Sequence, residues 1–483
     1  MAKNFSIEWT HHTLPLFALA LLVATGQAEE KEPEDEAASP AVRLIQSMSV
    51  MELYKSEKTD IPVQPEEVAK VKSLLWAKYR EEEKQNPKRM QEHKSKQIKF
   101  FDSVMRYEYR RIGERPESGY PLYIALHGGG GVPAQVNDSQ WNHMKGLYAG
   151  SVKNGIYLAP RGISNGPGLH AEGNSFPLYD RLIENMILFE GVDPNRVYLL
   201  GYSAGGDGVY QTSPRMADRF AAANMSAGHH NNVNPANLHN LPFLLQVGEN
   251  DRAYGRHRAT VNYYLRLGDL QRANPGGYLH DVYVHAGRGH GFDDRGGAQN
   301  IMANPEAWMH KGDRTTKTVD TNAIRWLSKH TRNTFPKKVI WELSTRAPAR
   351  WFGGEQPDGE SFWPSNARGR QFYWLDLTAG DFTGTVAARI DKPSNTIIIE
   401  QPARWLRILL SGQMLDLSKP VNIQIHNKQS QLKRTPNLKT LVHTLVDRGD
   451  PNYMFEAELV IERSRANIVI GEEGGPYTTF SVQ

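Results

Sequence analysis

The strongest constraint on the fold is a short apolar run that leads directly into a serine flanked by glycines. Residues 197–200 (VYLL) precede the motif G-x-S-x-G at residues 201–205. A serine on a sharp turn between a strand and a helix adopts strained backbone angles, and the glycines remove side chains that would crowd such a turn. The pattern predicts that Ser203 is a nucleophile held above the edge of a sheet, at the start of a helix.

The wider pattern, from residue 98 to residue 335, alternates apolar runs with helical segments. Apolar runs without strict alternation are typical of strands buried on both faces of a parallel sheet, and the helices between them cover those faces. We therefore predict an α/β fold with a parallel-rich sheet. Strands are expected at residues 105–111, 122–126, 156–159, 197–200, 221–225, 243–247 and 282–285, and helices at 179–190, directly after 203, at 256–272 and at 321–331.

A nucleophilic serine needs a base, and the base needs an acid that orients it. Where the serine lies on a strand-to-helix turn, the acid comes next in the chain and the histidine last. Asp251 and His290 each follow the end of a predicted strand, and open α/β sheets place their sites at those ends. We predict that His290 is the base and Asp251 the orienting acid, with Glu249 as the alternative acid.

Four consecutive glycines, residues 128–131, follow the predicted strand at 122–126. The backbone N–H of Gly128 or Gly129, together with that of Ala204, is predicted to bind the negative charge that develops on a substrate oxygen. A flexible linker and a phosphate-binding loop are the alternatives. The chain has neither a G-x-G-x-x-G helix start with a ribose-binding acid nor a G-K-[ST] motif, which argues against the phosphate-binding alternative.

Further candidates lie near the same predicted sheet edge. His229 and His230 follow the predicted strand at 221–225, so they are candidates to line a substrate pocket, with a capped loop as the alternative. No metal site is predicted, because no ligand spacing accompanies these histidines, and no cofactor is expected. Asp207 is expected to pair with Arg161 rather than to act in the site.

The N-terminus has the pattern of a secretory signal. Residues 14–24 form an apolar run of 11 residues, and small residues stand at positions 26 and 28, as a cleavage site requires. The run is too short for a membrane-spanning helix, which needs about 20 residues. We predict removal of residues 1–28 and a secreted or periplasmic protein with no stable membrane span. The chain contains no Cys, which excludes disulfides and a Cys nucleophile.

Composition changes along the chain predict three further parts. Residues 29–97 are expected to form an acidic linker and a helical leader, with a helix at 65–91, and residues 98–335 the catalytic domain. Residues 337–483 are expected to form a separate, mostly β domain. Its strands are predicted at 339–343, 371–377, 386–390, 396–400, 406–410, 421–426 and, last, 456–461, with one helix at 438–446. The net charge of +4 is spread without a basic stripe, so no nucleic-acid partner is expected.

With these motifs in place, the chain resembles the α/β-hydrolase superfamily. Residues 98–335 are similar to secreted esterases of the polyhydroxybutyrate-depolymerase and feruloyl-esterase kind. Prolyl-oligopeptidase-like peptidases share the same motifs. The resemblance rests on Ser203 in Gly-Tyr-Ser-Ala-Gly-Gly, Asp251 in Gly-Glu-Asn-Asp, His290 in Gly-Arg-Gly-His-Gly and the His-Gly-Gly-Gly turn at 127–130. It implies an α/β-hydrolase fold and covers about half of the chain, and it leaves the β-rich part unassigned.

Three functions follow from this sequence, in order of preference. The first is a secreted serine hydrolase that cleaves small or polymeric carboxylic esters through an acyl-enzyme. The second is a serine peptidase, although residues 29–97 are too short for the propeller that such peptidases usually carry. The third is a binding protein with a vestigial hydrolase domain. Aromatic residues of the β-rich part, which either stack on sugars or form its core, are Trp351, Phe352, Phe362, Trp363, Phe372, Tyr373, Trp374 and Trp405.

Overall fold

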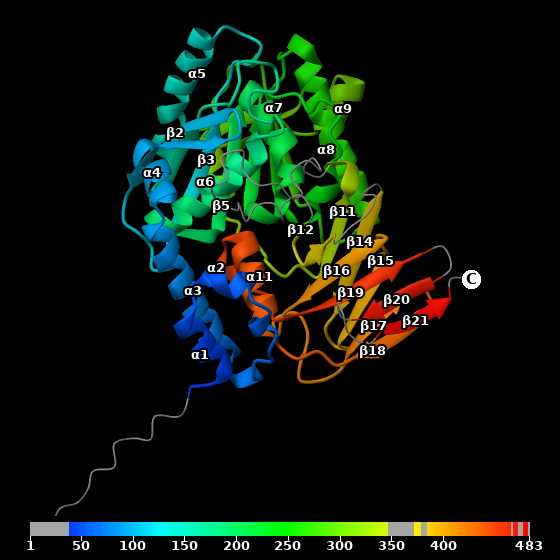
Figure 1. Cartoon of the computed structure of the whole chain (residues 1–483). Helices are drawn as coiled ribbons and strands as arrows, with labels where there is room; N and C mark the ends of the chain where they lie inside the picture. The colour runs from blue at the N-terminus through cyan, green and yellow to red at the C-terminus, as the bar shows by residue number, and fades with distance from the viewer. Residues whose placement is uncertain (1–37, 346–370, 378–383, 465–466, 472–476, 482–483) are drawn as a thin grey trace, which may run out of the picture. The chain divides into compact units, whose positions relative to one another are not determined.

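The computed structural model describes residues 38–345, 371–377, 384–464, 467–471 and 477–481. Residues 40–483 form one compact unit, drawn in Figure 1. The predicted signal peptide and the start of the acidic linker lie outside the described residues. Within the described part of the chain, no helix is both long enough and apolar enough to cross a membrane.

The centre of the unit is a large mixed sheet. Its strands are β1 (Gln97–Phe100), β2 (Ser103–Ile112), β3 (Tyr120–Leu126), β4 (Gly155–Pro160), β5 (Val192–Tyr202), β6 (Ala222–Ser226), β7 (Phe243–Gly248), β8 (His280–His285), β9 (Ala298–Met302) and β10 (Thr316–Asp320). Their order is β1-β2-β4-β3-β5-β6-β7-β8-β9-β10. Neighbours from β4 to β8 run parallel, while β2 is antiparallel to β4. The predicted parallel-rich α/β sheet is confirmed, with β1, β9 and β10 as additional antiparallel edge strands.

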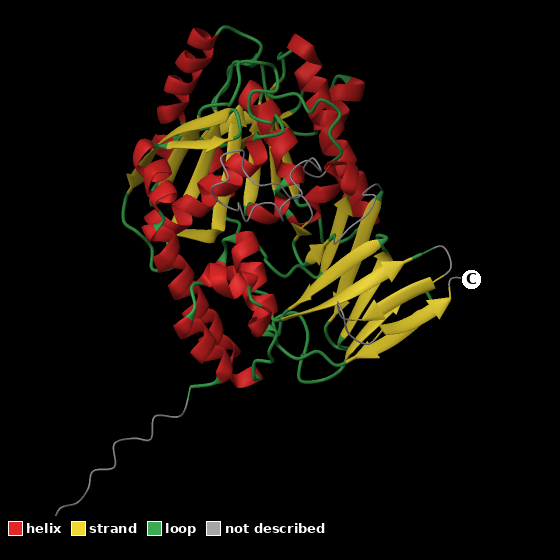
Figure 2. Ribbon diagram, viewed as in Figure 1, coloured by secondary structure: helices red, strands yellow, loops and turns green. Residues whose placement is uncertain are grey.

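Helices lie on both sides of this sheet (Figure 2). They are α5 (Ala134–Leu147), α6 (Ser175–Glu190), α7 (Ala204–Thr212), α8 (Arg256–Ala273), α9 (Pro305–Lys311) and α10 (Ala323–Leu327). Because both faces are covered, every residue of β4, β6 and β7 is buried. The predicted helix at 321–331 is shorter, since Asn322 caps its start and the helix ends at Leu327. Helix α5 was not predicted, because its few apolar residues give little helical periodicity.

The helical leader consists of α1 (Pro40–Ser47), α2 (Val50–Lys55), α3 (Val68–Gln85) and α4 (Pro87–Ser95). The single helix predicted over 65–91 is two helices. Asn86 ends α3, and its side chain caps the N-terminus of α4. Pro87 cannot continue a helix from the preceding turn, but it is well suited to the first position of a new one. Buried ion pairs join α4 to α6, with Arg89 Nη2 3.0 Å from Glu184 and Arg181 Nε 2.8 Å from Glu92.

The described residues of the β-rich part form two sheets and the helix α11. One sheet has the order β11-β14-β15-β17-β18 and the other β12-β13-β16-β19-β20-β21. The bounds are β11 (Lys338–Glu342), β12 (Gln371–Phe372), β13 (Leu375–Asp376), β14 (Thr385–Asp391), β15 (Thr396–Gln401), β16 (Trp405–Leu410), β17 (Val421–Ile425), β18 (Lys428–Leu432), α11 (Leu438–Arg448), β19 (Ala457–Arg463), β20 (Asn467–Gly471) and β21 (Tyr477–Ser481). The strand predicted at 456–461 is present as β19, but it is not the last one, because β20 and β21 extend the sheet beyond it.

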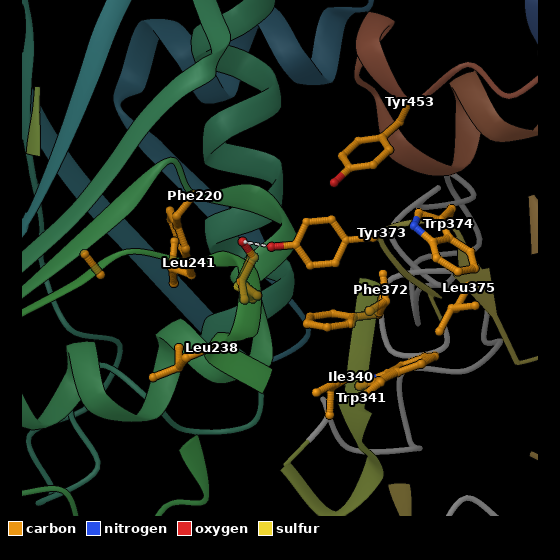
Figure 3. Close-up of a cluster of buried hydrophobic side chains, with 14 of the residues drawn as sticks. Phe220, Leu238, Leu241, Ile340, Trp341, Phe372, Tyr373, Trp374, Leu375 and Tyr453 are labelled. Carbon is orange, nitrogen blue, oxygen red and sulfur yellow. Dashed lines mark hydrogen bonds between the residues drawn. The ribbon is translucent and has the colours of Figure 1, made fainter. Parts of the chain in front are cut away.

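A continuous apolar core crosses the boundary near residue 336. Figure 3 shows Phe220, Leu238 and Leu241 on one side and Trp341, Phe372, Tyr373 and Trp374 on the other. The Tyr373 hydroxyl donates a hydrogen bond to the Ala217 carbonyl at 3.1 Å. The separate β domain at 337–483 therefore stays a prediction, since buried contacts cross its border.

The same core decides the role of three aromatic residues. Phe372, Tyr373 and Trp374 are at most 2 % exposed, so they pack inside the protein and cannot stack on a sugar. Residues 351, 352, 362 and 363 lie outside the described residues.

Candidate active site

Ser203 occupies the turn between β5 and α7 with φ 59° and ψ −125°. A positive φ is a strained conformation for a residue with a side chain. The turn leaves no room beside it: a Cβ on Gly201 would lie 2.3 Å from the Gly205 carbonyl oxygen, and one on Gly205 would lie 2.0 Å from the Leu126 carbonyl oxygen. The two glycines of the motif are thus required by close backbone approach. The Ser203 N–H donates to the Ser226 carbonyl at 3.0 Å.

The structure brings the three predicted residues together. His290 Nε2 lies 3.0 Å from Ser203 Oγ, and His290 Nδ1 lies 2.8 Å from Asp251 Oδ2. Asp251 is 2 % exposed, whereas the His290 side chain is 45 % exposed and so is open to a substrate. With Nδ1–H donating to Asp251, Nε2 is free to accept the Ser203 proton.

The structure also separates the two candidate acids. Glu249 Oε2 accepts a hydrogen bond from the Gly287 N–H at 2.7 Å and lies 2.9 Å from Arg314 Nη2. Glu249 therefore fixes the beginning of the loop that carries His290. Asp251, two residues later, faces His290 itself, and its second oxygen lies 3.6 Å from Arg256 Nη1.

The four-glycine loop lies against the serine turn. A Cβ on Gly128 would lie 3.4 Å from Ser203 Cβ. The N–H groups of Gly130 and Gly131 donate to Asn137 Oδ1 on α5 and to the Asn165 carbonyl after β4, each at 2.9 Å. Gly128 and Gly129, together with Ala204, remain the predicted donors to a substrate oxygen.

Buried side chains hold this loop in one conformation. Asn137 Nδ2 donates to the Val132 carbonyl at 2.9 Å and to Asn165 Oδ1 at 3.1 Å. His127 Nε2 accepts the Gly162 N–H at 3.1 Å, so the His127 proton is on Nδ1, 2.6 Å from the Gly128 carbonyl. Burial lowers the pKa of His127 to about 4, so this imidazole is neutral near pH 7.

Two positions missed by sequence reasoning contact the predicted residues. Asn137 lies on the unpredicted helix α5, so no pattern pointed to it. Tyr202 is the variable residue before the serine; its hydroxyl donates to the His290 carbonyl at 2.6 Å and accepts the Phe292 N–H at 3.1 Å. An aromatic residue with a hydroxyl at that position was a signal that could have been noticed.

His229 and His230 form a stacked pair with ring centroids 5.1 Å apart. Each Nδ1 accepts a backbone N–H, from Asn231 at 3.1 Å and from Asn232 at 3.0 Å. His229 Nδ1 also lies 2.9 Å from Asn231 Oδ1. Among the residues that the structure describes, no group of three His, Asp or Glu residues could hold a metal. Pocket lining by this pair stays a prediction.

The predicted pairing of Asp207 with Arg161 is wrong. Asp207 Oδ1 accepts the His229 N–H at 2.7 Å, whereas Arg161 Nε binds Asp138 Oδ1 at 2.8 Å. The first turn of α7 directs Asp207 toward the loop after β6, whereas Arg161 follows β4.

No family model matches the chain, and no curated protein matches it. Among solved structures, it is similar to a thermostable esterase at 20 % identity, over 47 % of this chain and 60 % of that one, with a TM-score of 0.30. It is also similar to LpqC, a poly(3-hydroxybutyrate) depolymerase from Bordetella parapertussis, at 16 % identity, over 47 % and 88 % of the two chains, with a TM-score of 0.33. A ferulic acid esterase matches at 17 % identity, over 40 % and 89 %, with a TM-score of 0.29.

The chain spans 60 % of the length of the thermostable esterase. At identities of 16–20 %, such matches bear on the fold of a chain and not on its substrate. The strand order, the parallel strands from β4 to β8 and the strained serine turn define an α/β-hydrolase fold with additional C-terminal β sheets.

Proposed function

We propose that this protein is a serine hydrolase that cleaves carboxylic esters. The observation that carries the proposal is the unbroken hydrogen-bonded series from Ser203 Oγ to His290 at 3.0 Å and from His290 to Asp251 at 2.8 Å. Both distances are those of a nucleophile and base within hydrogen-bond reach, with the base oriented by a third group.

In the proposed acylation step, Ser203 Oγ attacks the ester carbonyl carbon and His290 Nε2 takes the serine proton. The carbonyl oxygen becomes an oxyanion, which accepts hydrogen bonds from the N–H groups of Ala204 and of Gly128 or Gly129. When the tetrahedral intermediate breaks down, the bond to the alcohol oxygen is cleaved. His290 returns its proton to the departing alcohol, and the acyl group stays on Ser203.

In the proposed deacylation step, water attacks the acyl-enzyme and gives a proton to His290. The second tetrahedral intermediate releases the carboxylic acid, and His290 returns the proton to Ser203 Oγ. Asp251 stays ionised throughout and stabilises the imidazolium that forms in each half of the cycle.

The test is hydrolysis of p-nitrophenyl acetate, butyrate and octanoate by the chain starting at Glu29. We expect activity that Ser203→Ala abolishes and that Ser73→Ala, an exposed serine on α3, leaves intact. The preferred acyl length then measures the size of the acyl pocket. Labelling of Ser203 by a fluorophosphonate reports the nucleophile independently of the substrate.

Other outcomes would favour the alternative functions. Cleavage of aminoacyl-nitroanilides without ester hydrolysis would indicate a serine peptidase. A chain that cleaves neither and takes up no fluorophosphonate would indicate a binding protein. We also propose export after removal of residues 1–28, which N-terminal sequencing of the protein from the producing cell would test; an intact Met1 would contradict it.

A further inference from the structure

We propose that Asp294 is a positioning residue that fastens the His290 loop to the serine turn through Ser226. This inference rests on the proposed function, because it assigns a role within that same site. His290 and Asp294 lie on one loop between β8 and β9, four residues apart. Proton transfer from Ser203 requires this loop to hold His290 at hydrogen-bond distance from the serine hydroxyl.

Ser226, the last residue of β6, is bonded to both sides. Its carbonyl accepts the Ser203 N–H at 3.0 Å, and its hydroxyl donates to Asp294 Oδ2 at 2.6 Å. One residue thus links the backbone of the nucleophile to a side chain of the histidine loop. The Ala323 N–H donates to the Asp294 carbonyl at 2.8 Å, which holds the backbone of this loop as well.

Burial of Asp294 as an ionised carboxylate costs folding free energy. It is 1 % exposed, and its Oδ1 has no hydrogen-bond partner among the described residues. Arg295 Nε lies 4.0 Å from Oδ1, and the Tyr148 hydroxyl donates to Oδ2 at 2.7 Å. Burial raises the pKa of Asp294 to about 6, although the hydrogen bonds from Ser226 and Tyr148 oppose the shift.

A buried carboxylate with one oxygen unsatisfied destabilises a protein, and such groups call for a functional explanation. Asparagine would fill the same space without the charge. A carboxylate oxygen instead accepts a strong, charge-assisted hydrogen bond from the Ser226 hydroxyl, which fixes the loop to β6 more tightly than an amide could.

Other contacts hold the part of the same loop nearest His290. Tyr202 holds the His290 carbonyl, and Phe292 stacks on His285 with ring centroids 4.3 Å apart. These contacts lie at and just after His290, whereas Asp294 holds the following end. Release of that end lets the imidazole move relative to Ser203 Oγ, and a misplacement of about 1 Å costs about 100-fold in rate.

The test is a double-mutant cycle with Asp294→Asn and Ser226→Ala on p-nitrophenyl butyrate. We expect each variant to lower kcat by about 10- to 100-fold, with KM changed less than about threefold. Because both act through one hydrogen bond, the double variant should be no slower than the slower single variant. The thermal midpoint of Asp294→Asn should equal or exceed that of wild type, because a buried charge is removed.

Tyr148→Phe is the matched control. It removes the other hydroxyl bound to the same carboxylate oxygen but leaves Ser226 bonded, so kcat should stay within about threefold of wild type. Additive losses in the double variant, or equal losses for Tyr148→Phe and Ser226→Ala, would overturn the inference and leave a general structural role for Asp294.

A second measurement does not depend on turnover. We expect a strongly downfield NMR signal from the proton between His290 and Asp251, which lie 2.8 Å apart, and a shift or loss of that signal in Asp294→Asn. An unchanged signal together with wild-type kcat would reject the role of Asp294 alone. A wild type inactive on every ester would reject the proposed function, and the NMR signal would still test the positioning of His290.

Discussion

At the scale of single residues, the serine turn depends on two glycines that have no Cβ atom. Gly201 and Gly205 allow the chain to pass from β5 to α7 with Ser203 as the single residue between them. Neighbouring carbonyl oxygens occupy the space that side chains at the two glycine positions would need. Interiors packed at this density do not open without displacing backbone. The strained backbone angles of Ser203 persist because neighbouring strands hold the turn, for example through the hydrogen bond from the Ser203 N–H to the Ser226 carbonyl on β6.

We predict that Gly205→Ala destabilises the protein by about 3 kcal/mol, at the upper end for overpacked sites, because its Cβ would lie 2.0 Å from the Leu126 carbonyl oxygen. Urea unfolding followed by fluorescence measures the change. Gly146→Ala on α5 is the control. A Cβ at this position would meet nothing within 4 Å. The free energy of unfolding of Gly146→Ala should therefore rise by about 0.4–1 kcal/mol. Equal stability of the two variants would contradict the close approach.

At the scale of elements, helix α5 holds the glycine loop through Asn137, which is fully buried. We predict that Asn137→Ala lowers kcat for p-nitrophenyl butyrate by about 10- to 100-fold. That loss is smaller than the 100- to 1,000-fold expected on removing an oxyanion donor itself, because the donors stay present but lose their support. Asn142→Ala, exposed on the same helix, should keep wild-type kcat. A larger change in KM than in kcat for Asn137→Ala would argue against this role.

The leader is joined to the sheet at Glu190, the last residue of α6. Its Oε1 lies 2.9 Å from His93 Nε2, 2.8 Å from the Tyr109 hydroxyl and 2.8 Å from Arg111 Nη2. Burial alone raises the pKa of Glu190, but the hydrogen bonds from His93, Arg111 and Tyr109 outweigh it and hold the pKa at about 2. A carboxyl with a depressed pKa stabilises the fold above its ordinary pKa, and this stabilisation disappears as pH falls through the folded pKa.

We therefore predict that Glu190→Gln is less stable than wild type by about 1.5–3 kcal/mol at pH 7, the range for hydrogen bonds to a charged group. The difference should shrink as pH falls from about 4.5 toward 2. Chemical unfolding at several pH values measures this difference. Glu108→Gln is the control, because the Glu108 side chain pairs with Lys96 and is 42 % exposed. A difference that does not depend on pH would show that the Glu190 charge contributes nothing.

At the scale of the whole molecule, buried charges join the α/β part to the β-rich part. Asp450 is fully buried and lies 2.8 Å from Arg332 Nη2 and 3.1 Å from Arg219 Nη1. Arg448 Nη1 lies 2.7 Å from Asp218 across the same junction. Burial by itself raises the pKa of Asp450, but Arg332 and Arg219 hold that pKa below its ordinary value. The junction is therefore held by buried ion pairs, in which each charge is compensated by a partner from the other part of the chain.

We predict that Asp450→Ala destabilises residues 40–483 as a single unit by about 3–5 kcal/mol, because it leaves two buried guanidinium groups uncompensated. Calorimetry should show one transition that moves as a whole. Asp269→Ala, which breaks an exposed pair with Arg272, should change stability by less than about 1 kcal/mol. Two separate transitions in wild type would indicate that the β-rich part folds independently, as the sequence predicts.

Much of the candidate site could be predicted because its signals are local. Strand, glycine, serine and glycine follow one another within residues 197–205, and Asp251 and His290 follow apolar runs of their own. The sequence favoured Asp251 but kept Glu249 as the alternative, since both follow the same strand. The choice between them depends on which carboxylate the end of β7 turns toward His290.

The sequence by itself determined the α/β class, the positions of the strands that precede the site residues and the three residues that meet there, because these follow from hydrophobic patterning and short-range turn chemistry. Only the tertiary structure decided what supports them. Asn137, Ser226, Asp294 and Asp450 are ordinary polar residues whose partners lie far away in the chain. Their roles come from burial, which makes each unpaired polar atom costly and each long-range partner necessary.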